Sequence, residues 1–184
     1  MKQREKVVPL ASGIVLEIGI GTGLNLPYYD ASRVQRLIGL DPSEASWKLA
    51  GERAAHLGFG VEFIGLPGEE IPLEDASVDT VLVTFALCTI PDPVAALRGM
   101  ARVLRPGGSL LFCEHGKAPD SNVCQWQDRI NPFWRRIAGG CNLNRDIPEL
   151  LGQGGFAVSE MKASYLPSTP KFAGFNYWGS AVHA

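Results

Sequence analysis

Several features that mark familiar classes of protein are scarce or missing in this sequence. The net charge is only −2, so no basic field indicates a nucleic-acid partner. No apolar run approaches the roughly 20 residues that span a bilayer, and no signal peptide precedes the first expected strand. The four cysteines lack C-x-x-C spacing and the three histidines are far apart, which favours free thiols over disulfides or a zinc site. We therefore expect a cytoplasmic protein without an integral membrane segment, a nucleic-acid partner or a metal.

Apolar runs alternate with helical patterns along the 184 residues, and no repeat, low-complexity tract or linker divides them. The pattern predicts a single α/β domain over residues 1–184, whose mainly parallel sheet is covered by helices on both faces. Helices are expected over 43–57, over 92–104 with Asp92 as the N-cap, and after Asp146. The expected strands lie near residues 14–18, 36–40, 61–64, 78–84, 109–114, 156–163 and 176–182.

A glycine-rich turn follows the first expected strand and is the most informative feature of the chain. Gly19, Gly21 and Gly23 alternate with other residues, and such a turn brings backbone N–H groups against a ligand. Asp41 ends the next expected strand, where a carboxylate suits the two hydroxyls of a ribose. The dinucleotide pattern G-x-G-x-x-G fails, because its third glycine is replaced by Leu24. The sequence therefore predicts a nucleoside cofactor other than a dinucleotide.

The segment from Glu17 to Gly23 reads E-x-G-x-G-x-G and resembles motif I of the class I S-adenosylmethionine (SAM) methyltransferases. Segments 38–43, 76–83 and 103–111 resemble further blocks of that family, in the same order and spacing. The resemblance implies a Rossmann-like, doubly wound, mainly parallel sheet of seven strands. It also implies that the chain binds SAM, releases S-adenosylhomocysteine and needs no metal, with Glu17 helping to hold the ammonium group of the cofactor.

The same resemblance implies where the cofactor binds. In the loop after the third strand, Pro67 stands where many relatives have an acid for the adenine amine, which leaves the N–H of Gly68 as a contact to the ring. Phe85 and Leu87 have two interpretations, as the apolar side of the cofactor site or as plain core residues. The full set of expected cofactor-binding residues is Glu17, Gly19, Gly21, Gly23, Asn25, Asp41, Pro42, Gly68, Glu69, Phe85 and Leu87.

Later segments narrow the resemblance to one branch of the family. Residues 86–90, 114–115, 126–134 and 140–145 look like the branch that contains the alkyl-thiol methyltransferases of animals and bacterial members of the quinone-biosynthesis type. This branch implies methyl transfer to a small-molecule acceptor, with an apolar thiol as one candidate. We expect residues 1–115 to form the cofactor half and residues 116–184 the acceptor half.

Four residues are expected near the acceptor, namely Cys88, Trp126, Asn142 and Arg145. The segment around Trp126 is either a lid with an aromatic pocket or a helix packed on the sheet, and Pro132 should kink or split it. Asn142 and Arg145 either bind a polar group of the acceptor or cap the neighbouring helix.

His115 and Glu114 are the expected catalytic residues. A thiol must be deprotonated before it attacks, and His115 has a suitable unperturbed pKa of about 6.5, with Glu114 orienting it or acting instead. The alternative is that His115 is satisfied by a backbone carbonyl in the turn.

Only about a dozen residues precede the first expected strand, whereas relatives usually have further N-terminal helices over the cofactor. We therefore expect those helices to be missing, with weaker SAM binding and a homodimer or a partner covering the exposed site. Two other functions remain open, a non-catalytic or partner-dependent SAM-fold subunit and a nicotinamide-dependent oxidoreductase. Leu24 and the absence of a Tyr-x-x-x-Lys set disfavour the oxidoreductase.

Overall fold

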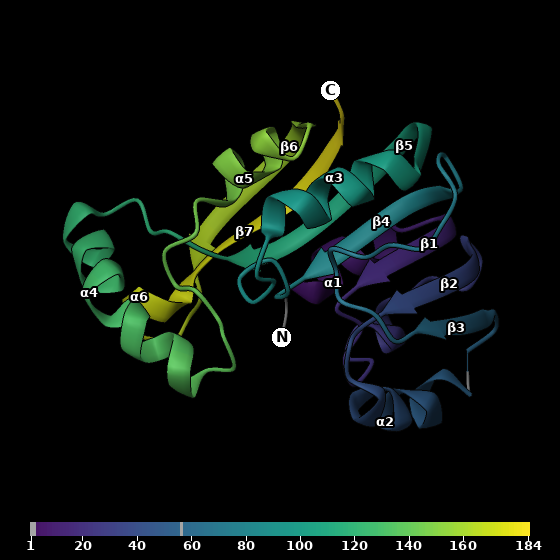
Figure 1. Ribbon diagram of the computed structural model, residues 1–184, viewed down its shortest axis with the longest axis horizontal. Coiled ribbons are helices and arrows are strands. Elements are labelled where there is room, and N and C mark those ends of the chain that lie inside the picture. The colour runs from purple at the N-terminus through teal and green to yellow at the C-terminus, as the bar shows by residue number, and fades with distance from the viewer. Residues whose placement is uncertain (1–2, 56) are drawn as a thin grey trace.

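The computed structural model describes residues 3–55 and 57–184. Residue 56 of the expected helix over 43–57, and residues 1–2 of the N-terminal segment, lie outside the described residues. One seven-stranded sheet runs through the described part of the chain, in the order β3-β2-β1-β4-β5-β7-β6 (Figure 1). The strands are β1 (Gly13–Ile18), β2 (Val34–Leu40), β3 (Gly60–Ile64), β4 (Val78–Thr84), β5 (Leu104–His115), β6 (Phe156–Tyr165) and β7 (Phe175–His183).

The first five strands are parallel, and β7 pairs antiparallel with both β5 and β6. The strand order reverses between β1 and β4, so the loops that follow these two strands diverge and leave a crevice at their carboxyl ends. β1 and β4 are mostly buried, as expected for strands covered on both faces, although β1 contains Glu17 and β4 contains Asp79, Thr80 and Thr84. The fold is thus the doubly wound α/β sheet that the sequence predicts.

Helices cover both faces of this sheet. On one face, α3 (Pro93–Val103) and α5 (Ile147–Gln153) bury Leu97 and Leu151 against strand residues such as Phe112. On the other face, Val7 of α1 (Arg4–Val7) and Ala50 of α2 (Glu44–Ala54) pack in a second core, and two 3-10 turns (η1, Val8–Leu10; η2, Leu26–Tyr28) join it. Figure 1 shows α4 (Ser121–Ile137) and α6 (Lys171–Gly174) beyond the end of the sheet at which β4 and β5 finish.

Asp92 and Asp146 cap helices as the sequence predicts, and Ser43 is a further cap. Ser43 accepts a hydrogen bond from the N–H of Ser46 at 3.2 Å, and Asp92 accepts one from the N–H of Ala95 at 2.9 Å. Asp146 caps α5 in the same way, at 3.3 Å from the N–H of Glu149. These caps start α2, α3 and α5 close to the carboxyl edge of the sheet, where the loops of the site lie.

Helix α4 is not split at Pro132, in contrast to one of the two expected outcomes. Proline removes the N–H that would bond to the carbonyl of Asp128, but both residues are exposed, so water can satisfy that carbonyl. The large apolar side chains between Trp126 and Ile137 do not form a core. Trp126 and Ile137 are 60% and 64% exposed, whereas Trp134 is half-buried and lies edge-to-face with Phe172 of α6.

Candidate functional site

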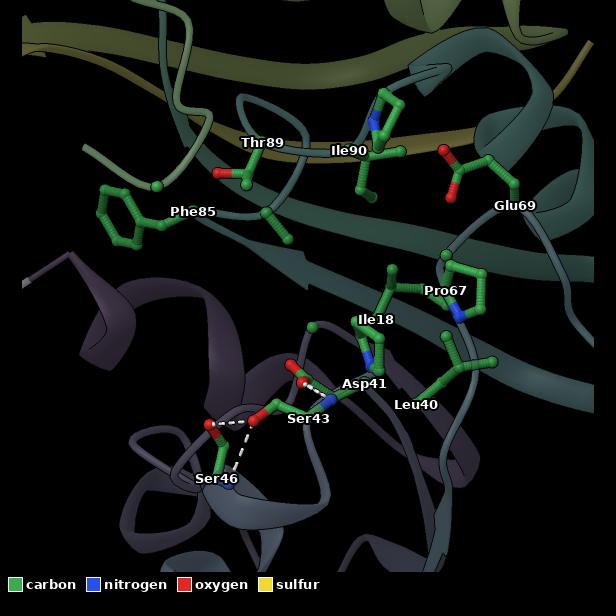
Figure 2. A pocket seen from close by; sticks show the side chains of 16 residues that line it. Ile18, Leu40, Asp41, Ser43, Ser46, Pro67, Glu69, Phe85, Thr89 and Ile90 are labelled. Carbon is green, nitrogen blue, oxygen red and sulfur yellow. Dashed lines mark hydrogen bonds between the residues drawn. The ribbon is translucent and has the colours of Figure 1, made fainter. Parts of the chain in front are cut away.

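A cavity of about 520 Å³ opens where β1, β2 and β4 end (Figure 2). Its volume is in the range of small-molecule sites. Ile18, Leu40 and Ile90 form apolar walls, while Asp41 and Glu69 bring carboxylates to the lining. The cavity therefore lies at the switch point of the sheet, where the sequence predicts the cofactor.

Gly19 shapes one wall of this cavity, because the chain needs both its backbone conformation and its lack of a side chain. Its φ of +71° favours glycine, and a Cβ there would lie 2.7 Å from the Cβ of Ala86. The loop after β1 can therefore approach the loop after β4. Gly21 and Gly23 belong to the same turn and do not line the cavity; the N–H of Gly21 donates to Asp41 at 3.0 Å.

Asp41 is held at the cavity by two backbone hydrogen bonds. Its Oδ2 accepts from the N–H of Gly21 at 3.0 Å and its Oδ1 from the N–H of Ser43 at 2.8 Å, the second of which is drawn in Figure 2. Each carboxylate oxygen retains a lone pair that can accept another donor. This fixed acceptor suits the hydroxyls of a ribose. Pro42, which follows, also lines the cavity.

Glu69 carries an unsatisfied acceptor in the same cavity. Its Oε1 accepts from the N–H of Asp92 at 3.0 Å, but its Oε2 is buried without a partner among the described residues. Gly68 lies beside it, where a Cβ would come within 2.9 Å of Ile90. Figure 2 shows Glu69 on the side of the cavity opposite Phe85. A donor such as an aromatic amine would satisfy Glu69, so the two carboxylates and the apolar walls fit the adenosine part of SAM.

Glu17 lies behind the glycine turn in a buried network and does not line the cavity. It accepts hydrogen bonds from Asn25 at 2.8 Å and from the hydroxyl of Tyr29 at 2.7 Å. Arg4 donates to the side-chain oxygen of Asn25 at 2.5 Å and to the hydroxyl oxygen of Thr84 at 2.8 Å. The network ties α1, the glycine turn and the end of β4 together. The role of Glu17 and Asn25 toward the cofactor stays a prediction.

Burial raises the pKa of Glu17 to about 7, although hydrogen bonds from Tyr29 and Asn25 and the charge of Arg4 oppose the rise. The negative charge of Asp41 adds to it. A proton on Glu17 is therefore easier to keep in the folded protein than in the unfolded chain.

Glu114 is buried and holds the loop that follows β4. Its Oε1 accepts from the N–H of Ala86 at 2.8 Å and of Leu87 at 3.2 Å. These bonds fix the loop next to Phe85, whose φ of +53° is unusual for an aromatic residue. Burial raises the pKa of Glu114 to about 7, against those backbone hydrogen bonds. Leu87 is fully buried in the core and does not line the cavity.

His115 meets two cysteines rather than the backbone carbonyl considered as an alternative. Its Nε2 lies 2.9 Å from the Sγ of Cys141, and the Sγ of Cys88 completes a cluster whose three ligand atoms lie within 4.8 Å of one another. Hydrogen bonds from Cys88 and His115 and the charge of His115 hold the pKa of Cys141 well below its usual range, despite burial. The neighbouring Cys141 and burial raise the pKa of Cys88.

Asn142 and Arg145 join the two loops that carry this cluster. The Nδ2 of Asn142 donates to the carbonyl of Cys88 at 2.9 Å. Arg145 donates to the carbonyls of Leu87 and, at 2.7 Å, of Ile90. Neither residue lines the cavity, and Trp126 is exposed on α4. The structure thus brings Cys88, Asn142 and Arg145 close to His115 and leaves Trp126 apart.

A second cavity of about 720 Å³ shares Phe85 with the first. Arg4 and Lys6 line it from the N-terminal segment, and Tyr165 and Leu166 from the end of β6 and the loop after it. Sequence reasoning missed these residues, because nothing in their local pattern joins segments about 160 positions apart.

Within the described residues, no helix has the length and apolar character needed to cross a bilayer.

Comparisons with known proteins identify the family. A family model described as a methyltransferase domain matches residues 16–112, more than half of the chain. The chain belongs to this family. Thiol S-methyltransferase TMT1B of Homo sapiens is 36% identical over 176 residues, which cover 89% of this chain and 71% of that protein.

Solved structures support the class I fold. A geranyl diphosphate methyltransferase in complex with SAM superimposes with a TM-score of 0.76 at 14% identity, covering all of this chain and 85% of that one. A SAM-dependent methyltransferase from Methanosarcina mazei superimposes with a TM-score of 0.69 at 19% identity, and the match covers 91% of each chain. Together with the family match, this fold makes the protein a class I SAM-dependent methyltransferase.

We expect the variant Asp41→Asn to bind S-adenosylhomocysteine at least tenfold more weakly than the natural protein. The amide has one oxygen in place of two, so it cannot serve Gly21, Ser43 and two ribose hydroxyls together. Calorimetric titration measures the dissociation constant, and Asp30→Asn, an exposed change outside the cavity, is the matched control. Equal affinities of the two variants would contradict the assignment of Asp41.

We expect Glu17→Gln to flatten the pH dependence of stability. The unfolded chain loses the Glu17 proton near pH 4.5, whereas the folded protein keeps it to about pH 7. Between these values rising pH favours the unfolded state. The free energy of unfolding of the natural protein falls by on the order of 3 kcal/mol by pH 7 and then stays constant. Glutamine does not titrate, so the variant is spared this loss. Its free energy of unfolding therefore rises relative to that of the natural protein as the pH increases from 4.5 to 7.

Urea unfolding between pH 5 and pH 8 measures this difference. Glu62→Gln, an exposed change on β3, is the control and should follow the natural protein. A constant difference between Glu17→Gln and the natural protein at every pH would show that the Glu17 pKa is not raised.

Proposed function

We propose that this methyltransferase transfers the methyl group of SAM to the sulfur of a small apolar thiol. The observation that carries the proposal is the match to human thiol S-methyltransferase TMT1B, which spans 89% of the chain. That match reaches well beyond residues 16–112 of the family model, into the half of the chain that we assign to the acceptor. The division of residues 1–115 for the cofactor and 116–184 for the acceptor is part of the proposal.

The cofactor would bind in the cavity at the ends of β1, β2 and β4. Asp41 would accept hydrogen bonds from the ribose hydroxyls and Glu69 from the adenine amine, between the apolar walls. When bound, SAM supplies an electrophilic methyl group on its sulfonium. Phe85 and Ala86 line the same cavity and would shield that end from water.

The acceptor would enter through the second cavity. Phe85 lines both cavities, so an acceptor there would lie beside the methyl group, and most of the exposed lining is apolar. Holding the acceptor sulfur in line with the methyl carbon can supply on the order of 7–11 kcal/mol of the barrier. This positioning is the main contribution that we assign to the walls of the two cavities.

The thiol must lose its proton before the sulfur attacks, because the thiolate is the nucleophile and a free thiol has a pKa of about 8.5. We assign the proton to the neutral form of His115, whose side chain is half-buried beside the loop after β4 and whose pKa is raised by the hydrogen bond to Cys141 despite burial. The new bond joins the thiolate sulfur to the methyl carbon while the sulfonium–methyl bond breaks, and S-adenosylhomocysteine takes that electron pair. Glu114 would act as a positioning residue, since its carboxylate is bonded to the loop.

We also propose a reducing compartment, the cytoplasm, as the place of action. All four cysteines are free thiols in the structure, as is usual for proteins of that compartment.

A panel of acceptors matched in size tests the acceptor class. An alkyl thiol, a phenol and an alkyl amine with the same apolar group are compared by the release of S-adenosylhomocysteine. We expect kcat/KM for the thiol to exceed the other two by at least tenfold. Turnover of the phenol or the amine with none of the thiol would overturn the proposal.

We expect His115→Ala to lower thiol turnover at least tenfold while the affinity for S-adenosylhomocysteine barely changes, because His115 lies outside the cofactor cavity. His183→Ala, an exposed change at the end of β7, is the control and should retain full activity. Unchanged turnover of His115→Ala would remove this residue from the mechanism.

A further inference from the structure

Three metal-ligating side chains converge from three separate segments. Cys88 lies in the loop after β4, His115 ends β5 and Cys141 follows α4. One ligand atom from each lies within 4.8 Å of the other two, and 26 residues separate His115 from Cys141 in the chain. No C-x-x-C pattern connects them, so the sequence favoured free thiols without a metal, and only the fold reveals the cluster.

The backbone around the cluster is held firmly. The main-chain N–H and the side-chain amide of Asn142 both donate to the carbonyl of Cys88, at 2.8 and 2.9 Å. Arg145 bonds to the carbonyls on either side of that segment, those of Leu87 and Ile90. The carboxylate of Glu114 bonds to the N–H of Leu87 from β5. Fixed supports of this kind orient ligands in metal sites.

The ligand set selects a thiophilic metal. Two cysteine sulfurs and one imidazole nitrogen are the preferred donors of zinc, and three protein ligands leave one tetrahedral position for another group. No fourth histidine, cysteine or carboxylate joins the cluster within the described residues. His115 and Cys141 are half-buried rather than enclosed, so an external ligand can reach them.

We propose that Cys88, His115 and Cys141 bind a zinc ion that leaves its fourth position to an exogenous ligand. Resting on the proposed function, that ligand would be the sulfur of the acceptor. Thr89, the neighbour of Cys88, and Gly139, two residues before Cys141, line the cofactor cavity, so the cluster lies at a wall of that cavity. A zinc-bound thiol is deprotonated outright, and its proton passes to solvent. In the zinc-loaded protein His115 is then a ligand, and the metal replaces it as the means of forming the thiolate.

Metal binding is tested on the full chain, reduced and freed of metal, without SAM or thiol. Cobalt(II) serves as the spectroscopic probe and zinc as the competitor. We expect one equivalent of cobalt to give sulfur-to-cobalt charge-transfer absorption with the visible bands of a tetrahedral site, and one equivalent of zinc to abolish both. Absence of saturable absorption at one equivalent would overturn the proposal.

Variants locate the site. Cys88→Ser, Cys141→Ser and His115→Asn should each weaken zinc binding at least tenfold. Cys124→Ser is the matched control, because Cys124 donates to the carbonyl of Ala118 and lies outside the cluster. Affinities equal to that of the control in all three variants would contradict the site. His115→Asn keeps both thiols, so it answers the question if a serine variant fails to fold.

Activity separates this proposal from the proposed function. Zinc binding by the cluster without thiol methylation would overturn the thiol acceptor and leave the metal site standing. Thiol methylation at full rate by the metal-free protein would overturn the role of zinc in forming the thiolate and leave His115 as the free base.

Discussion

Much of the site depends on one buried carboxylate, that of Glu114. Its Oε1 accepts from two consecutive N–H groups of the loop after β4, and so holds Phe85 in the left-handed conformation. Phe85 lines both cavities, and Cys88 follows three residues later. Because side chains alternate along a strand, Glu114 can bond to this loop while His115 faces Cys141. One strand end therefore sets both the cavity walls and the cysteine–histidine cluster.

A second buried carboxylate, that of Glu17, supports the segment that follows the glycine turn. Glu17 binds Asn25 and Tyr29 and thereby fixes the glycine turn from behind. Burial raises the pKa of Glu17, as it does that of Glu114, so both carboxyls carry a cost of desolvation that their hydrogen bonds only partly offset. Glu17 and Glu114 thus support the loops of the site, whereas Asp41 and Glu69 line the cavity itself.

The fold could be predicted because its signals are local. Apolar runs bounded by glycine and acidic residues gave every strand to within a few positions, apart from the early start of β5, and Asp92 and Asp146 cap helices as expected. The parallel pairing of β1 to β5 follows from alternation with helices and from the chirality of the crossovers, whereas the antiparallel place of β7 between β5 and β6 does not. The position of Asp41 at the cavity follows as well, since strand ends of a parallel sheet share one edge.

The finer arrangement could not be predicted, because it depends on contacts between distant segments. The sequence indicates Glu17 as an acid beside glycines, but its partner Tyr29 and the nearby Arg4 are brought to it by packing. Arg145 has no local signal for its bonds to the loop after β4. Trp126, a large aromatic residue at helical spacing, is mostly exposed, since α4 lies beyond the end of the sheet.

The most direct test of the account is to identify the atom that receives the methyl group. The protein is incubated with SAM carrying a ¹³C-labelled methyl group and a small acceptor that has both a thiol and a hydroxyl, and carbon NMR follows the label. The account predicts a single new resonance in the region of methyl thioethers as the sulfonium resonance decays. A resonance in the methyl ether region instead would contradict the assignment of sulfur as the acceptor.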